Sequence, residues 1–263
     1  MLNTIKKVGP VLDLFTAEQP EWRMTDVARA LEMPKSSAHA LVTTLADVGL
    51  LSLTSSGRYR LGWNLLSLAE RMRASLDLKG IATPAMQALE GDVRENVLLA
   101  VLDRREVVYV DKVEGTHPMV RLAGVRVGSR APAHCTAVGK VLLAEREPEE
   151  VRALLQSTGL RAMTRRTITS IEAFEEELKQ VRIHGVGYDR QEIVAEVGCL
   201  AAPVYDRWGN VVAAVSLAMP WYRFERKERS LVAPLRAAAD AITARMSAPE
   251  TSTPAARPVL VAA

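Results

Sequence analysis

The order of short elements in the first 62 residues constrains the fold more than any other feature of the sequence. Apolar residues recur at helical spacing over residues 4–16, which predicts an amphipathic first helix. A short second helix is expected from Thr25, which we take as its N-cap. A third helix is predicted to begin at Pro34, because the N–H that proline lacks would be unpaired at the first helical position. Two short helices joined by a tight turn are typical of a helix-turn-helix.

The predicted third helix has an apolar face and a polar face. Ala38, Leu41, Leu45 and Val48 form the apolar stripe, and Gly49 is expected to end the helix. A narrow face of small polar groups can enter the major groove and form hydrogen bonds with base edges. The residues that we predict to contact DNA from this helix are Lys35, Ser36, Ser37, His39, Thr43 and Thr44.

A two-stranded hairpin is predicted directly after this helix. Residues 51–53 and 58–61 alternate like strands around turn-forming residues 54–57. Arg58 and Arg60 are expected to point outward as a wing that contacts phosphates or the minor groove. The residues expected to face the domain are Leu51, Leu53, Tyr59 and Leu61. Residues 1–62 are therefore predicted to form a winged helix-turn-helix DNA-binding domain, with a helical bundle for protein contacts as the alternative.

A further helix is expected to link this domain to the rest of the chain. Leu65, Leu68, Ala69, Met72 and Leu76 recur at three- and four-residue steps, so residues 63–79 are predicted to form a linker helix. Two interpretations remain open: the helix packs on its own domain, or it pairs with its copy in a second chain. Helix-turn-helix proteins commonly bind two half-sites through two-fold symmetry, which favours dimerisation.

Composition limits the remaining alternatives. The 263 residues have a net charge of +3, and residues 1–79 carry ten Lys/Arg and eight Asp/Glu, so charge permits DNA binding without requiring it. No stretch is apolar enough for a membrane span, and no signal peptide is recognised, so a cytoplasmic protein is expected. The two cysteines, Cys135 and Cys199, lie far apart without zinc-binding spacing, which fits a reducing compartment.

Residues 80–247 are predicted to form a mixed α/β domain around one sheet, followed by a flexible tail at residues 248–263. Thr169 and Glu172 are interpreted as a capping box for one of its helices, which stops at Gly185. The predicted strands are residues 96–102, 107–113, 200–205 and 211–217, and the predicted helices are residues 138–144, 171–183 and 224–246.

Catalytic and metal-binding patterns are absent from the sequence. We find no phosphate-binding loop, no dinucleotide fingerprint and no H-E-x-x-H, and the four histidines show no ligand spacing. His134 and Cys135 are adjacent, and on a strand their side chains would point to opposite faces. No catalytic residue, metal or cofactor is therefore expected, although an enzyme that oligomerises through a winged helix remains an alternative.

Several segments resemble the IclR family of transcription regulators. Residues 128–140 (GSRAPAHCTAVGK) and 185–192 (GVGYDRQE) carry the resemblance, together with residues 199–204 and 213–216 and parts of the predicted recognition helix and wing. The resemblance runs from about Thr4 to Met246. It implies a winged helix-turn-helix joined to a GAF-like effector-binding domain, usually assembled as a dimer or tetramer. Members of the family repress or activate operons, often for the breakdown of organic or aromatic acids.

The resemblance also implies an effector site. The residues that match the family's pocket are Val120, Ala137, Val138, Asp189, Cys199 and Ser216. A helix N-terminus near Ala137 favours a carboxylate, to which Asp189 and Ser216 add hydrogen-bonding groups and Val120 and Cys199 an apolar wall. Simpler alternatives stay open, because Cys199 fits a core position and Asp189 fits a solvated loop.

The sequence departs from the family pattern at two positions. Ala40 stands where the recognition helix often has an arginine, and Ala218 stands where relatives can have a second serine. The expected function is an effector-responsive transcription regulator that binds double-stranded operator DNA and a small organic or aromatic acid. A constitutive DNA-binding protein whose second domain only oligomerises is the alternative.

Overall fold

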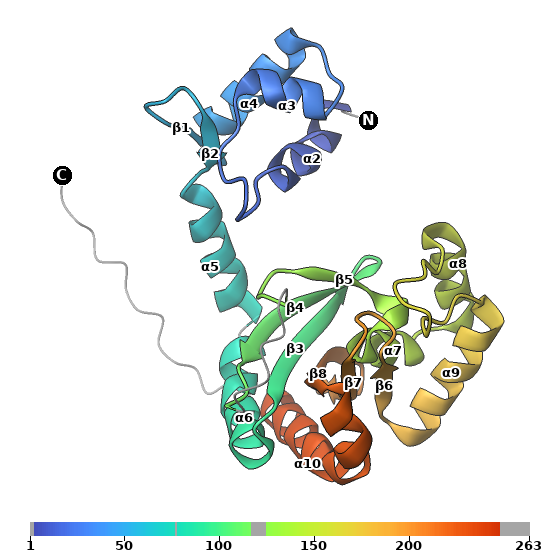
Figure 1. Ribbon diagram of the computed structural model, residues 1–263. Helices are drawn as coiled ribbons and strands as arrows, with labels where there is room; N and C mark the ends of the chain where they lie inside the picture. Colours follow the sequence, from blue (N-terminus) through green and yellow to red (C-terminus); the bar gives the residue numbers. More distant parts are fainter. Residues whose placement is uncertain (1–2, 77, 117–124, 248–263) are drawn as a thin grey trace, which may run out of the picture. The chain divides into compact units, whose positions relative to one another are not determined.

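The chain forms two compact units, Met1–Asp77 and Leu78–Ala263, in a computed structural model that describes residues 3–76, 78–116 and 125–247. The first unit contains helices and a small hairpin, and the second contains a six-stranded sheet with helices on both faces (Figure 1). The N-terminal helix-turn-helix and the C-terminal mixed α/β domain confirm the predicted fold class. The predicted tail at residues 248–263 lies outside the described residues.

The first unit consists of five helices and two strands within its described residues. Its elements are α1 (Asn3–Lys6), α2 (Val8–Asp13), α3 (Met24–Ala30), α4 (Lys35–Asp47), β1 (Leu51–Leu53), β2 (Tyr59–Leu61) and α5 (Asn64–Leu76). Val11 of α2, Val27 of α3 and Val42 of α4 are fully buried against one another in its core. Three packed helices followed by an antiparallel hairpin form the winged helix-turn-helix.

Three features of the helices differ from the predictions: one helix is broken, and two helices start at other residues. The single first helix is broken at Lys7, because Pro10 has no N–H to bond the carbonyl of Lys6 and its ring would clash with that carbonyl. Thr25 is not an N-cap: Arg23 is the N-cap and α3 begins two residues earlier than predicted, after the backbone of Trp22 pairs with Tyr59.

The third difference is at Pro34, which is the N-cap of α4 and not its first helical residue. Its backbone is extended, with φ −55° and ψ 139°, and its carbonyl accepts the first helical hydrogen bond from the N–H of Ala38 at 3.0 Å. The helix therefore begins at Lys35, one residue later than predicted.

The apolar face of α4 is shifted from the predicted stripe. Ala38, Leu41 and Leu45 are buried as expected, whereas Val48 is 52% exposed and Val42 takes its place in the core. Val48 is the residue that caps the helix, and the chain then turns through Gly49 at φ +78°. The predicted stop at Gly49 is confirmed, but the stripe does not continue to its last expected member.

The hairpin forms where it was predicted, but only part of its inner face is covered. Leu51 pairs with Leu61 and Leu53 pairs with Tyr59, so all four side chains lie on one face. Leu51 is buried and Tyr59 packs partly buried against the helices, whereas Leu53 is 60% exposed and Leu61 is also exposed. The prediction that all four face the domain is therefore wrong for Leu53 and Leu61.

Helix α5 carries apolar side chains that its own unit does not cover. Trp63 just before the helix is 75% exposed, Leu66 is 58% exposed, and Leu68 is exposed too. The start of the helix is held to α4, since Asn64 Nδ2 donates to the carbonyl of Val48 at 3.1 Å. Of the residues predicted to form its apolar face, Leu65 is half-buried, whereas Leu68, Ala69 and Met72 are exposed. The interpretation that the linker helix buries this face on its own domain is therefore wrong.

The second unit has three layers (Figure 1). Its antiparallel sheet has the order β5-β4-β3-β8-β7-β6, with α6 and α10 on one face and α7, α8 and α9 on the other. Its elements are α6 (Leu78–Val93), β3 (Asn96–Asp103), β4 (Glu106–Val113), β5 (Arg130–Pro132), the 3-10 helix η1 (Ala133–Cys135), α7 (Ala137–Ala144), α8 (Pro148–Thr158), α9 (Ile171–His184), β6 (Gly187–Arg190), β7 (Val197–Tyr205), β8 (Val211–Pro220) and α10 (Trp221–Ser247).

The two faces of the sheet differ in the size of their side chains. In β8, Val215, Leu217 and Met219 pack toward α6 and α10, whereas Ser216 and Ala218 point to the opposite face. Successive residues of a strand alternate between faces, so large and small side chains are sorted along one strand. The small side chains leave space between the sheet and the start of α7.

Two local predictions in this unit are wrong. The N-cap of α9 is Ser170, whose Oγ accepts from the N–H of Ala173 at 3.3 Å, so Thr169 does not begin a capping box. His134 and Cys135 lie in η1 and not on a strand, because the chain leaves β5 and turns directly into α7. The predicted stop of α9 is confirmed at Gly185, with φ +60°.

Candidate functional site

A cavity of about 450 Å³ lies between the sheet and the N-terminus of α7. Five of the six residues predicted for the effector site line this cavity: Ala137, Val138, Asp189, Cys199 and Ser216. They come from α7, β6, β7 and β8, so the fold brings together positions that are far apart in the sequence. Val120, the sixth, lies outside the described residues. Other lining residues include Leu98, Tyr109, Val125, Thr136, Ile193 and Ala218.

The N-terminus of α7 is one wall of the cavity. Thr136 caps the helix, because its Oγ1 accepts from the N–H of Gly139 at 3.1 Å and its carbonyl accepts from the N–H of Lys140 at 3.0 Å. The N–H groups of Ala137 and Val138 come first in the helix and have no partner within it. They carry the positive end of the helix dipole and favour a negatively charged group.

Asp189 places a buried carboxyl group against the same space. It lies on β6 opposite Cys199 of β7, and its side chain is almost fully buried, so the solvated-loop interpretation is wrong. Oδ1 accepts from the N–H of Glu192 at 2.6 Å, whereas Oδ2 is buried and has no hydrogen-bond partner among the described residues. Burial raises the pKa of this carboxyl to about 7, and the charge of Glu192 adds to the rise.

A buried lysine, Lys140, is linked to Asp189 through Glu192. Lys140 of α7 is 1% exposed, and its Nζ lies 2.5 Å from Glu192 Oε1 and 2.9 Å from Glu177 Oε1. The loop that carries Glu192 is also held by Thr167, whose hydroxyl donates to the Glu192 carbonyl at 2.6 Å. No role was predicted for Lys140, although a lone lysine in the apolar stretch 137–144 signals a buried ion pair.

The two thiols are free. Burial raises the pKa of Cys135 to about 12 and raises the pKa of Cys199 well above its ordinary value, with the charge of Asp189 adding to both. A nucleophilic cysteine needs a lowered pKa and an adjacent base. His134 does not supply that base, since its Nε2 lies 3.0 Å from the carbonyl oxygen of Arg161. Both thiols therefore act as packing groups here.

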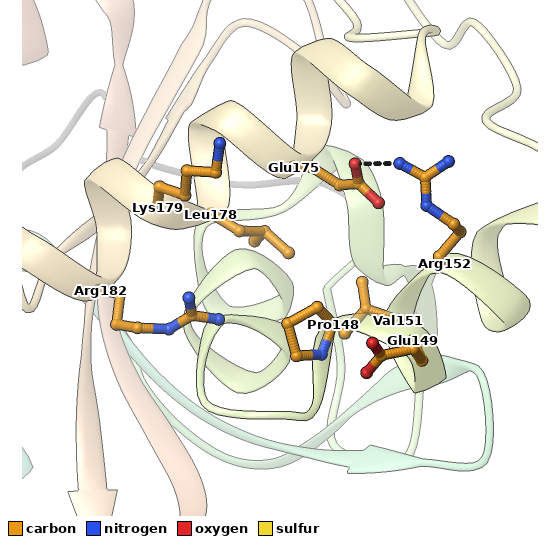
Figure 2. A pocket seen from close by; sticks show the side chains of 8 residues that line it. All are labelled: Pro148, Glu149, Val151, Arg152, Glu175, Leu178, Lys179 and Arg182. Atoms are coloured by element: carbon orange, nitrogen blue, oxygen red, sulfur yellow. Dashed lines mark hydrogen bonds and ion pairs between the residues drawn. The ribbon is translucent and has the colours of Figure 1, made fainter.

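A second, smaller hollow of about 230 Å³ lies between α8 and α9 (Figure 2). Its cationic side chains already have protein partners: Arg152 forms an ion pair with Glu175, and Arg182 donates to the carbonyl of Ala144 at 2.7 Å. Since these charges are satisfied on its rim, this hollow is a poorer candidate for a ligand site than the cavity at α7.

The residues predicted to contact DNA lie mostly on exposed surfaces of the first unit. On α4, Thr43 is half-buried and the other five are exposed; on the wing, Arg60 is exposed and Arg58 is half-buried. Thr44 Oγ1 donates to the carbonyl of Ala40 at 2.8 Å, so part of its hydrogen-bonding capacity is used within the helix.

Among residues 3–76, 78–116 and 125–247, no group of three or more His, Cys, Asp or Glu side chains is arranged to hold a metal ion. None of the helices in these ranges is long and apolar enough to cross a membrane.

The chain matches two family patterns that together cover most of its length. Residues 4–54 match the "IclR helix-turn-helix domain", and residues 71–244 match the "Bacterial transcriptional regulator IclR C-terminal" domain. It is 34% identical over 247 residues to the HTH-type transcriptional regulator KdgR of Escherichia coli K12, covering 93% of each chain.

Similar solved structures give the same result. An IclR homolog from Microbacterium hydrocarbonoxydans, complexed with 4-hydroxybenzoate, is 30% identical with a TM-score of 0.80, covering 93% of this chain and 99% of that one. The C-terminal domain of E. coli KdgR is 38% identical with a TM-score of 0.59, covering 65% of this chain and 99% of that domain. With both of its domains matched in order, the chain belongs to the IclR family of bacterial transcription regulators.

Proposed function

We propose that the cavity beside α7 binds a small carboxylate effector and that this binding changes how the winged helix engages operator DNA. The observation that carries the proposal is the placement of the first N–H groups of α7, at Ala137 and Val138, on a cavity that is otherwise largely apolar. A pocket of about 450 Å³ falls within the usual range for small-molecule sites. Ser216 adds a hydroxyl and Asp189 a carboxyl group to the polar part of the wall.

The effector class is inferred from the lining. Leu98, Val125 and Ile193 surround the polar end with apolar side chains, which suits an organic acid with an apolar or aromatic body. The similar protein from M. hydrocarbonoxydans is complexed with 4-hydroxybenzoate, an acid of this kind. The regulated genes are then those for the breakdown of such acids, and the protein works in the cytoplasm, where its DNA is.

DNA binding is assigned to the polar face of α4 and to the wing. The residues to which we assign these contacts are Lys35, Ser36, Ser37, His39, Thr43, Thr44, Arg58 and Arg60. Because Ala40 supplies no charge, Lys35 and the two wing arginines carry the phosphate contacts. The protein binds as a homodimer, since the exposed apolar side chains of Trp63 and Leu66 need a partner surface and two half-sites need two recognition helices.

The test of DNA binding is fluorescence anisotropy with the protein's own upstream DNA across a salt series. The triple variant Lys35→Ala/Arg58→Ala/Arg60→Ala should bind more weakly, and its salt slope should fall by about 0.9 for each phosphate that the variant no longer neutralises. A triple variant with the same charge change in the second unit, Arg104→Ala/Arg105→Ala/Lys179→Ala, is the control. Equal affinities for the two variants would overturn the assignment of these residues.

The test of effector binding uses the same assay with added organic acids. An effector should shift the DNA affinity of the wild type and raise its melting temperature, because a ligand that binds only the folded state stabilises that state. If organic acids change neither quantity, the second unit only assembles the protein and DNA binding is constitutive.

A further inference from the structure

The buried oxygen Oδ2 of Asp189 is the feature that the effector site leaves unexplained. Its partner oxygen Oδ1 is fixed by the Glu192 N–H at 2.6 Å, so Oδ2 of this cavity-lining side chain has no such bond among the described residues. A buried carboxylate oxygen without a partner is costly. A group that enters the cavity can provide that partner, and the question is which atom carries the hydrogen.

The surroundings of Asp189 contain more negative than positive groups. Two carboxyl groups, of Glu192 and Glu177, contact the one ammonium of Lys140. The carboxyl group of Asp189 is tied to the same loop through the Glu192 N–H. Arg130 of β5 also lines the cavity, but its guanidinium forms ion pairs with Asp103 and Glu106. The other titratable groups that act on this cluster come from β7, η1 and β4; they are Cys199, Cys135 and Tyr109. Burial raises the pKa of all three, so they stay neutral and do not offset the negative charge.

The carboxylate of Glu192 also lacks a full set of partners. Its Oε1 accepts a hydrogen bond from the ammonium of Lys140, and its buried Oε2 has no hydrogen-bond partner among the described residues. A carboxylate effector at the α7 N-terminus would therefore meet Asp189, on which the charge of Glu192 already acts. Two carboxylates that share a site do not both stay ionised, since like charges at close range raise the pKa of one of them.

We propose that a carboxylate effector binds this cavity together with one proton from solvent, held between the effector and Asp189 Oδ2. Before binding, the cavity carries the one negative charge of ionised Asp189. The anionic effector adds a second negative charge and the proton cancels it, so the complex carries no more negative charge at the cavity than the free protein. The proton completes the hydrogen-bonding of Oδ2, and the helix N–H groups keep the second effector oxygen. Effector binding thus becomes weaker as pH rises through neutrality. This inference rests on the proposed effector site.

Isothermal titration calorimetry measures the proton directly, in buffers of different ionisation enthalpy. The probes are benzoate and 4-hydroxybenzoate. The hydroxyl of 4-hydroxybenzoate can donate a hydrogen bond to Asp189 without proton uptake, whereas benzoate has no such donor. With benzoate we expect uptake close to one proton at about pH 8.5 and little uptake at about pH 5.5, where Asp189 is already protonated. The Kd should rise about tenfold for each pH unit above about 7.

Asp189→Asn should bind benzoate with no proton uptake and with an affinity that is nearly independent of pH. Glu176→Gln removes an exposed carboxyl on α9 that forms an ion pair with Lys179 and not with Lys140, and should behave as the wild type. In Glu192→Gln the uptake should persist; its loss there, with retention in Asp189→Asn, would place the proton on Glu192 and overturn the proposal.

The remaining outcomes separate the two proposals. If the wild type binds benzoate with no uptake, or releases a proton, the effector site stands and the proton linkage is wrong. If neither probe nor any other monocarboxylate binds across this pH range, the carboxylate effector class fails and the proton linkage fails with it, whereas DNA binding by the winged helix is unaffected.

Discussion

Lys140 Nζ lies 2.5 Å from Glu192 Oε1, and both side chains are buried between α7 and the loop after β6. Breaking such a pair by removing one partner leaves the other charge buried without compensation, which costs about 3–5 kcal/mol. Lys140→Met should therefore lower the free energy of unfolding by about that amount in urea denaturation. Lys179→Met, on the exposed side of α9, should change it by less than about 1 kcal/mol. Equal effects of the two variants would contradict the role assigned to Lys140.

The stability of the protein should depend on pH through Asp189. Its pKa is raised from 3.8 to about 7, so the folded state binds the proton more tightly than the unfolded state. The folded state therefore loses stability as pH rises from about 4 to about 7, and the loss is complete above that range. The difference between the two pKa values corresponds to about 4 kcal/mol.

Asp189→Asn keeps the acceptor for the Glu192 N–H but cannot ionise. Its melting temperature relative to the wild type should therefore increase from pH 5 to pH 7 and level off above about pH 8. Thermal melts across pH measure this difference. A difference that does not vary with pH would show that Asp189 has an ordinary pKa in the folded state.

Two glycines in helices should respond in opposite ways to alanine. A Cβ on Gly139 of α7 would lie 2.1 Å from the carbonyl oxygen of Ala133, a backbone atom that cannot move aside. Gly139→Ala should therefore destabilise the protein by about 1–3 kcal/mol. Gly91 of α6 has open space around its Cβ position, so Gly91→Ala should stabilise the protein by about 0.5–1 kcal/mol. Chemical denaturation of both variants checks the pair, and a stabilised Gly139→Ala would contradict the packing of α7 on η1.

The exposed face of α5 should be the surface on which two chains pair. Leu66→Glu places a charge among its exposed apolar side chains and should convert the proposed dimer into a monomer, as measured by size-exclusion chromatography with light scattering. Ser67→Glu, at the next position on the helix, should leave the assembly unchanged. A dimer that survives Leu66→Glu would assign dimerisation to another surface.

Much of the fold was predictable because its signals are local. Runs of residues that favour strands define β3 and β4, turn residues 206–210 define the β7–β8 hairpin, and Gly185 ends α9 in the left-handed conformation. Helix starts were predicted less well. Thr25 has the chemistry of an N-cap, but the long-range pairing of Trp22 with Tyr59 sets where α3 begins, and no local signal reports it.

The site was predictable only in part. The resemblance to the IclR family named five residues that the structure places on one cavity. It did not identify the ion pair of Lys140 with Glu192, because the two residues are 52 positions apart and meet only after β6 joins the edge of the sheet. The strand β6 itself was missed, since its four residues include Gly187 and Asp189, which are typical of turns.

The position of β8 in the sheet affects how the protein is made. Strand β3 pairs with β8 across a separation of 122 residues between Asn96 and Ala218, and β8 supplies Ser216 to the cavity wall. Domains fold in order as the chain leaves the ribosome. The DNA-binding unit is therefore complete in the nascent chain well before β8 is synthesised, so the first unit can fold before the second unit is finished. Ribosome-bound chains that end before residue 211 would lack the strand that completes the effector cavity.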